Sequence, residues 1–448
     1  MGNYLKKSKK IIVGVIGILL VLIVLPFLIP TEKYLAQFER EGSALLGVPV
    51  EIAHARLYFI PSPRLGVEGV VIGKSQDVTI QSLTVVPSLS ALFSSSRTIA
   101  LNIHQPTVKD SAVPIVNKLF DSKSSNAAPL PVEISSIHMD GLKLVWPSIK
   151  LPILDVQANF AKGMQFSDAE IKSVDDQLVA NILSSDTGHT IVLKMHNWVM
   201  PLSKPFLVDQ GRVDMALSGS HLDVSKLTMQ MYGGTLNGNA TLDWQKTWQL
   251  NGQLHMKDLS LKAPTKMLNP NTYMDGRLVG NGRFAANVKN ADQLLNQLRA
   301  EFTFTINNGV LYGLDLVKLA SLLVRQTPKG GQTQFDTFTG QLAISGKRYQ
   351  LKRLHVSSGL ITAKGDVKIN EQEKLDGKGD VEIKQSVGLV SVPMVVSGTL
   401  DNPLVYPSKA ALAGAAVGTA ILGPGLGTSL GSKAGSAVEG LKDLFGGD

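Results

Sequence analysis

Cysteine is absent from the 448-residue chain, which excludes disulfides, zinc–cysteine sites and thiol chemistry but leaves an oxidising compartment open. Aromatic residues are scarce, at 6% of the chain, and the basic excess is small. The formal charge is +8, and four of these charges come from Lys6, Lys7, Lys9 and Lys10, before any acidic residue. Beyond residue 30 there is no cluster of Lys, Arg and aromatic residues, so we expect no nucleic-acid partner.

Arrangements that would support catalysis or metal binding are also lacking in the sequence. Gly427, Ser429 and Gly431 match a Gly-Xaa-Ser-Xaa-Gly elbow, but the hydrolase order then needs a histidine further along, and the last one is His355. The eight histidines are scattered singly, without carboxylates at helical spacing. We therefore expect a protein that is not an enzyme, with no catalytic residue, no cofactor and no metal site.

One long uncharged run is present, IIVGVIGILLVLIVLPFLI from Ile11 to Ile29. As a helix it would cover about 30 Å, the hydrocarbon thickness of a bilayer, so it predicts a single-pass membrane anchor. No Ala-Xaa-Ala cleavage pattern follows it, which favours an anchor over a signal peptide. The lysine cluster before it places the amino terminus in the cytoplasm and the rest of the chain across the membrane. The predicted anchor residues include Ile11, Ile18, Leu22 and Ile29.

Alternation of apolar and polar residues dominates the rest of the chain. From residue 248 to 256, for example, apolar residues at even positions face one way and polar residues at odd positions face the other. Glycines punctuate these runs where turns, bulges or curvature are expected. The pattern predicts a mainly β, predominantly antiparallel sheet protein with few helices, at 31–46, 111–121, about 290–299 and 315–325.

A sheet with one apolar face must hide that face. Either the sheet curls and fills its interior with its own side chains, or it leaves a groove for an apolar ligand. Composition does not decide between these two outcomes. The candidate residues that would line such a groove are Leu250, Leu254, Met256, Phe302, Phe304, Ile306, Leu342, Ile344, Ile361 and Val367.

The periodicity changes within the segment NNGVLYGLDLVKLASLL, residues 307–323. Strand-like alternation before it gives way after Gly313 to helical spacing, and Asp315 is placed to cap the new helix. This helix would carry one apolar stripe, formed by Leu316, Leu319, Ala320 and Leu323.

Two segments differ in composition from the alternating runs. The polar stretch DSKSSNAAPLP, residues 121–131, predicts an internal linker. Beyond Pro407 the chain is rich in glycine and alanine, and glycines recur at every fourth position. On a helix these would form a bare face against which another helix or a lipid could pack. The alternative is a mobile tail. The glycines of the predicted packing face are Gly423, Gly427, Gly431 and Gly435.

Several phrases, in this order along the chain, resemble the AsmA family of inner-membrane-anchored periplasmic proteins. They include LLGVPVEIAHARLYFIPSPRLGVEGVVIG at 45–73 and MYGGTLNGNATLDW at 231–244. A strand-to-helix signature then follows at Gly309, Leu311, Gly313, Asp315 and Leu316. The resemblance covers most of residues 1–407. It divides the chain into a cytoplasmic tail and anchor (1–30), an amino-terminal AsmA-like unit (31–121), a linker (122–131), a β-groove region (132–407) and a Gly/Ala-rich tail (408–448).

The resemblance implies an elongated, curved, mostly antiparallel β-sheet groove after an amino-terminal transmembrane helix. It also implies phospholipids as partners, attachment to the inner membrane, and a role in outer-membrane lipid homeostasis and integrity. The helix after Asp315 would then cover the groove. The tail offers a surface for an outer-membrane or periplasmic protein. The alternative function is a non-enzymatic assembly factor or scaffold for outer-membrane proteins, acting through sheet edges.

Overall fold

The computed structural model describes residues 32–88, 98–115, 133–146, 149–201, 205–318, 330–385 and 388–413. The chain forms two compact units, up to His196 and from Asn197 onward. The predicted anchor at 11–29, the linker at 122–131 and the tail glycines lie outside the described residues, as do Leu319, Ala320 and Leu323. No helix in the part of the chain that the structure describes is long and apolar enough to cross a membrane.

The first unit is a mixed sheet with the strand order β1-β2-β3-(β4, β5)-β6-β8-β9-β10-β11, and β7 also pairs with β6. β4 and β5 occupy one position together and run parallel to β6, whereas the other pairs are antiparallel. The strands are β1 (Val50–Tyr58), β2 (Arg64–Ile72), β3 (Val78–Pro87), β4 (Thr98–His104), β5 (Thr107–Lys109), β6 (Glu133–Trp146), β7 (Ile149–Lys150), β8 (Leu154–Ala161), β9 (Gln165–Ser173), β10 (Leu178–Ser185) and β11 (Gly188–Val199).

The predicted division of the chain at residues 121–131 stays a prediction, because these residues lie outside the described ranges. Strands before and after this stretch belong to one sheet, because β4 and β5 pair with β6. Parallel neighbours need a connection of about a dozen residues or more, which the chain between β5 and β6 supplies. The boundary between the compact units lies at His196–Asn197.

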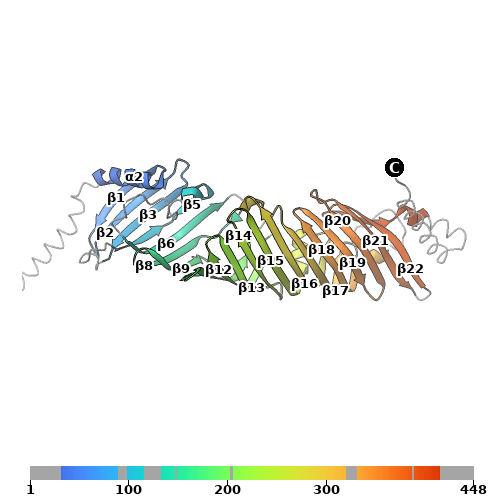
Figure 1. Cartoon of the computed structure of the whole chain (residues 1–448). Helices are drawn as coiled ribbons and strands as arrows, with labels where there is room; N and C mark the ends of the chain where they lie inside the picture. Colours follow the sequence, from blue (N-terminus) through green and yellow to red (C-terminus); the bar gives the residue numbers. More distant parts are fainter. Residues whose placement is uncertain are drawn as a thin grey trace, which may run out of the picture. The chain divides into compact units, whose positions relative to one another are not determined.

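Helix α2 (Glu32–Leu46) confirms the helix predicted at 31–46 and lies beside β1 (Figure 1). Glu39 Oε1 accepts a hydrogen bond from the Ile52 backbone N–H at 2.8 Å, and Ser43 Oγ accepts one from Val50 N–H at 2.9 Å. β1 pairs only with β2 among the described strands, so these N–H groups face its free edge. α2 therefore satisfies part of an edge that would otherwise be open to another strand.

The second unit is an antiparallel meander in which each strand, from β12 to β23, pairs with the next one along the chain (Figure 1). Together with the first unit, it confirms the predicted mainly β, mostly antiparallel fold. The strands are β12 (Leu207–Ser218), β13 (His221–Met231), β14 (Gly234–Asp243), β15 (Trp248–Ser260), β16 (Tyr273–Val288), β17 (Arg299–Tyr312), β18 (Gln332–Ser345), β19 (Arg348–Ser357), β20 (Ile361–Ile369), β21 (Leu375–Gln385), β22 (Gly388–Gly398) and β23 (Pro403–Pro407).

The helices predicted at 111–121 and 290–299 agree less well with the structure. The one at 111–121 begins as the 3-10 turn η2 (Asp110–Ala112) and continues to residue 115, where the description stops. The helix predicted at 290–299 is wrong, because only the 3-10 turn η4 (Ala291–Gln293) forms before β17 starts at Arg299. The structure adds α4 (Lys262–Leu268), which the sequence analysis missed.

Candidate functional site

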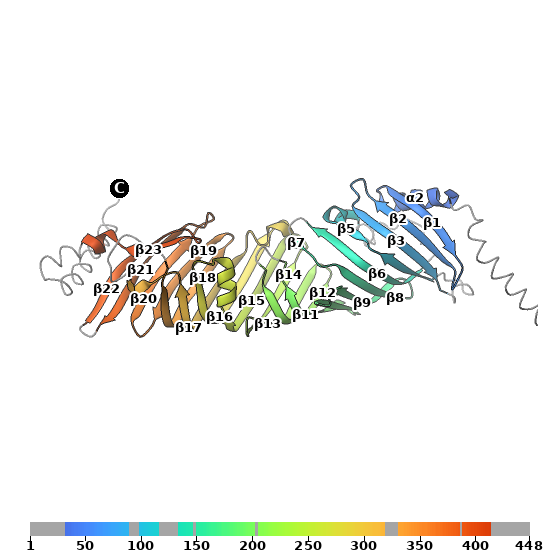
Figure 2. The ribbon, with the colours of Figure 1, turned by 180° about the vertical axis from the view of Figure 1, so that it is seen from behind.

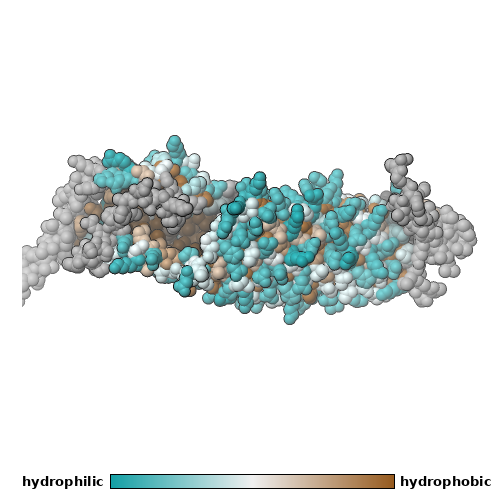
Figure 3. Space-filling model, viewed as in Figure 1, coloured by the Kyte–Doolittle hydropathy of each residue, from teal (hydrophilic) through white to brown (hydrophobic). Residues whose placement is uncertain are grey.

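The second unit has one apolar and one polar face. Along β15, side chains alternate between partly buried and exposed, and the exposed ones are polar, such as Gln253 and His255. Figure 3 shows hydrophilic residues predominating on the surface over β12–β20, and Figure 2 shows the same strands from behind. The face that carries Leu250, Leu254 and Met256 is called the apolar face below.

The strand register aligns the predicted lining residues into rows across the apolar face. Phe302 of β17 lies opposite Leu342 of β18, and Phe304 lies opposite Gly340. Ile344 belongs to a neighbouring row nearer one end of the strands, through Ala300, Phe284 and Gly252, and Leu250 lies one row further along, opposite Ala286. Within β15–β20, one row runs through Leu254, Gly282, Phe302, Leu342, Leu351 and Val367.

Glycines within these rows leave space for the aromatic rings of the neighbouring strands. A Cβ built on Gly282 would overlap the ring of Phe302, and one on Gly252 would overlap the ring of Phe284. The large side chain therefore lies over the glycine of the next strand instead of standing up from the sheet. The resulting surface is broad and smooth, because each aromatic ring fills the space where the neighbouring glycine has no side chain.

Most of the predicted lining residues keep some exposure to solvent. Ile306 and Ile361 are buried, with 5% and 0% of their surface exposed. The other eight are partly buried, neither covered nor fully open. Among the residues described, the main contacts of β13–β18 are with their neighbours in sequence and with α4, which packs on β16. Among the described helices and strands, α4 is therefore the main element outside the sheet that contacts these strands.

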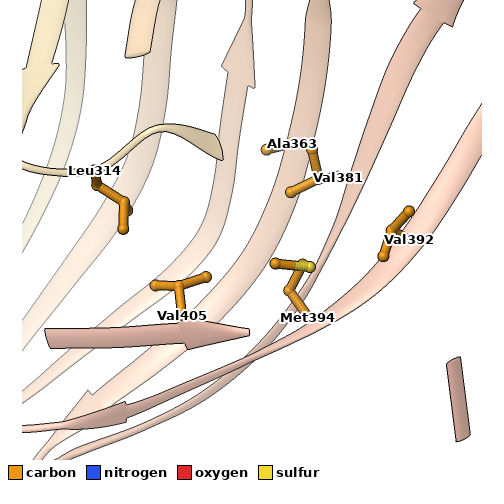
Figure 4. Packing of buried hydrophobic residues seen from close by; sticks show 6 residues of the cluster. All are labelled: Leu314, Ala363, Val381, Val392, Met394 and Val405. Atoms are coloured by element: carbon orange, nitrogen blue, oxygen red, sulfur yellow. The ribbon is translucent and has the colours of Figure 1, made fainter. Parts of the chain in front are cut away.

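The face is filled, however, at its carboxyl-terminal end. Figure 4 shows six buried side chains from β20–β23 and from the segment after β17 pointing toward one another. Val381, Val392 and Met394 are 2–3% exposed, and Leu311 and Leu316 pack against this cluster. The end plug, as we call it, consists of Leu314, Ala363, Val381, Val392, Met394 and Val405.

The segment after β17 reaches the end plug through a short set of polar contacts. Thr333, 3% exposed, donates to the carbonyl of Leu314 at 2.8 Å and accepts from Leu316 N–H at 2.9 Å. Asp315 Oδ1 accepts from Lys318 N–H at 2.9 Å, the capping contact that the sequence predicts. Of the predicted covering stripe, Leu316 is described and packs on the sheet. Leu314, which the sequence analysis did not single out, is itself one of the buried residues of the end plug.

The polar face carries paired charges on β20 and β21. Lys364 lies opposite Asp380, Asp366 opposite Lys378 and Lys368 opposite Asp376. Burial raises the pKa of Asp380, and the nearby Glu382 adds to the increase, while Lys364 opposes it. No group of three or more His, Cys, Asp or Glu in the described ranges could hold a metal ion.

Comparison with known proteins gives one match. The model of the AsmA family matches residues 203–349, which include β12 to β18 and so most of the apolar face. The predicted resemblance to this family is thereby confirmed over that stretch. No curated protein and no solved structure matches the chain.

Proposed function

We propose, from the AsmA-family match over residues 203–349 and the apolar face that these residues form, that the chain binds phospholipid acyl chains along this face and conducts them. One observation carries the proposal. A row of apolar residues crosses β15–β20, and its side chains remain partly exposed, although α4 packs on β16.

The energetics favour such a role. Exposing two acyl chains to water costs on the order of 25 kcal/mol, from about 0.8 kcal/mol for each of roughly thirty methylenes. An apolar surface that covers the chains removes much of this cost. Apolar contact is non-directional, so neighbouring positions on the face bind a chain about equally well, and a lipid can slide between them.

The face also has room for a lipid. From β14 to β19 the six strands cover about 24 Å at a spacing of ~4.8 Å. Half the hydrocarbon thickness of a bilayer, the length of one acyl chain, is about 15 Å. An acyl chain is therefore shorter than the width of these six strands.

Site-specific photo-crosslinking tests the proposal. A photo-crosslinking amino acid replaces Leu254 or Phe304 on the apolar face, and in matched controls it replaces Gln253 or Thr303, the adjacent exposed residues of the polar face. We expect phospholipid adducts at the first two positions and none at the controls. Equal labelling at all four positions, or none at any, would contradict the proposal.

The same experiment addresses the alternative function. If the chain is a scaffold for outer-membrane proteins, it binds them through sheet edges. The probes at Leu254 and Phe304 would then yield protein adducts or no adducts. The contacts of Glu39 and Ser43 with β1 weigh against the edge of the first unit as its docking strand, because they already satisfy two of its N–H groups.

The remaining parts of the proposal concern location and partners. We propose that residues 11–29 anchor the chain in the inner membrane, with the bulk of it in the periplasm, and that lipid carriage there supports the outer membrane without catalysis. The tail beyond residue 413 is proposed to contact a partner or a membrane. Fractionation of the expressed chain, with protease protection on each side of the membrane, tests the topology.

A further inference from the structure

The polar face of the second unit contains two cavities that the lipid proposal does not use. Their volumes are about 710 and 840 Å³. They lie side by side and share Asn251, Ala285, Arg299 and Ser345, which follow one another in register from β15 to β18. Both are thus hollows in the hydrophilic surface seen in Figure 3, near one end of the strands.

A small residue in an outward-facing position explains the hollow. Ala285 of β16 lies between Asn251 of β15 and Arg299 of β17, and its methyl group is much shorter than either neighbour. The turn after β18 and the connection before β17 form a wall on one side, where Gly346 N–H donates to Leu298 O at 2.8 Å. The bottom of the cavity is therefore formed by a small side chain, and its sides are formed by longer polar side chains.

The two cavities differ in charge. The smaller one is lined by Arg299, Lys347 and Arg348 and by a single carboxylate, that of Glu371. In the larger one the arginines are matched by equal numbers of acids, and Arg283 pairs with Glu301 at 3.2 Å. An anion is thus favoured in the smaller cavity alone.

The cations of the smaller cavity are only partly neutralised by the protein. Arg348 Nε lies 3.5 Å from Glu371 Oε1. Within the described part of the chain, no ion pair is formed by Arg299 or Lys347. Side-chain amides add neutral hydrogen-bond donors around these cations, from Gln249, Asn251, Asn287, Asn296 and Gln297.

We propose that the smaller cavity binds a phosphate group. Guanidinium and ammonium groups beside amide donors suit the three oxygens and the negative charge of a phosphate ester. Two sources share this chemistry, a lipid headgroup and a soluble phosphate ester. The cavity is separate from the apolar face, so the proposal stands whether or not that face carries lipids.

Binding of sn-glycerol 3-phosphate to the intact chain, measured by phosphorus NMR or calorimetry, tests the proposal. We expect saturable binding that weakens as ionic strength rises. Arg299→Gln should reduce the affinity about tenfold or more, since a charge-assisted hydrogen bond is lost. The control is Lys364→Gln, a cation on the same face whose strand partners His355 and Asp380 do not line the cavity, and this variant should bind as the parent chain does.

A second arm separates the sources. The chain is mixed with nanodiscs of phosphatidylcholine or of phosphatidylglycerol, and binding is compared for the parent chain and Arg299→Gln. Arg299-dependent binding to phosphatidylglycerol nanodiscs alone assigns a lipid headgroup, and Arg299-dependent binding of the soluble ester assigns a free phosphate. If neither probe binds in an Arg299-dependent way, or Lys364→Gln weakens binding equally, no specific site exists and the proposal is overturned. Circular dichroism verifies that each variant is folded.

Discussion

At the scale of single residues, the glycines of the apolar face are as much part of the candidate site as the large side chains. Gly282 has no side chain because Phe302 of the next strand occupies that space. The sequence analysis assigned glycines to turns, bulges and curvature. Their role as the partner of a large residue depends on the cross-strand register, which a single sequence does not give.

Gly282→Ala is therefore expected to destabilise the second unit by about 1–3 kcal/mol, because the new Cβ must push the Phe302 ring off the sheet. Thermal unfolding followed by circular dichroism measures the change. Gly359→Ala is the control, since a Cβ there meets nothing within 4 Å. Equal melting temperatures for the two variants would show that Phe302 does not depend on the space above Gly282.

The second prediction at this scale concerns Asp380. Burial raises its pKa in the folded state, so between the unfolded and the folded pKa the folded chain holds a proton that the unfolded chain has lost. Stability is therefore lost as the pH rises through that interval, and the penalty persists at neutral pH. We expect Asp380→Asn to raise the melting temperature at pH 7 and to raise it less as the pH falls below the ordinary aspartate pKa.

Melting curves across this pH range, with Asp376→Asn on the same strand for comparison, provide the check. A gain that is constant with pH would mean that the charge of Asp380 is not its source.

At the scale of elements, α2 acts through two side chains as an edge cover for β1. Glu39→Ala leaves the Ile52 N–H without its protein acceptor at a partly buried position, so we expect a loss of about 1 kcal/mol in the first unit. Hydrogen exchange should speed up at the Ile52 amide in particular. Glu41→Ala, which removes only an exposed contact with Gln37, should leave that exchange unchanged.

Thr333 links two elements, because its hydroxyl holds the segment after β17 against the sheet. Thr333→Val keeps the size of the side chain but leaves the Leu314 carbonyl and the Leu316 N–H unpaired. We expect a cost of about 1–3 kcal/mol for each buried group that stays unpaired. Chemical denaturation measures the loss, and Thr337→Val on the same strand serves as the control. If both variants unfold at the same denaturant concentration, the hydroxyl does not hold the segment.

Element prediction succeeded where the signal was local. Alternation within β15 and the cap at Asp315 depend on residues a few positions apart, and both are as the sequence indicated. α4 was missed because Pro264 and the short length conceal it. Leu314 was missed because its burial depends on Val392 and Val405, which lie far along the chain.

At the scale of the whole molecule, the unit boundary was also beyond local reasoning. The stretch 121–131 has the composition of a linker. Its composition does not reveal that the strands before and after it, β4 and β6, pair in parallel within one sheet. For the candidate site, the sequence supplied the identity of the lining residues. It did not supply the end plug, which divides the apolar face into a part with partly exposed side chains and a part filled by the protein.

The absence of cysteine allows this division to be tested with single substitutions. Leu254→Cys should react readily with a thiol reagent, whereas Val392→Cys, at a position only 2% exposed, should react slowly because its thiol is buried in the end plug. Short-chain phospholipid should slow the reaction of Leu254→Cys by covering the face, and should leave Gln253→Cys on the polar face unchanged. Fast labelling of Val392→Cys in the folded chain would mean that the plug opens and that the accessible part of the apolar face continues to β22. Unprotected Leu254→Cys would instead remove the support for lipid binding over β14–β19, while the end plug would stand.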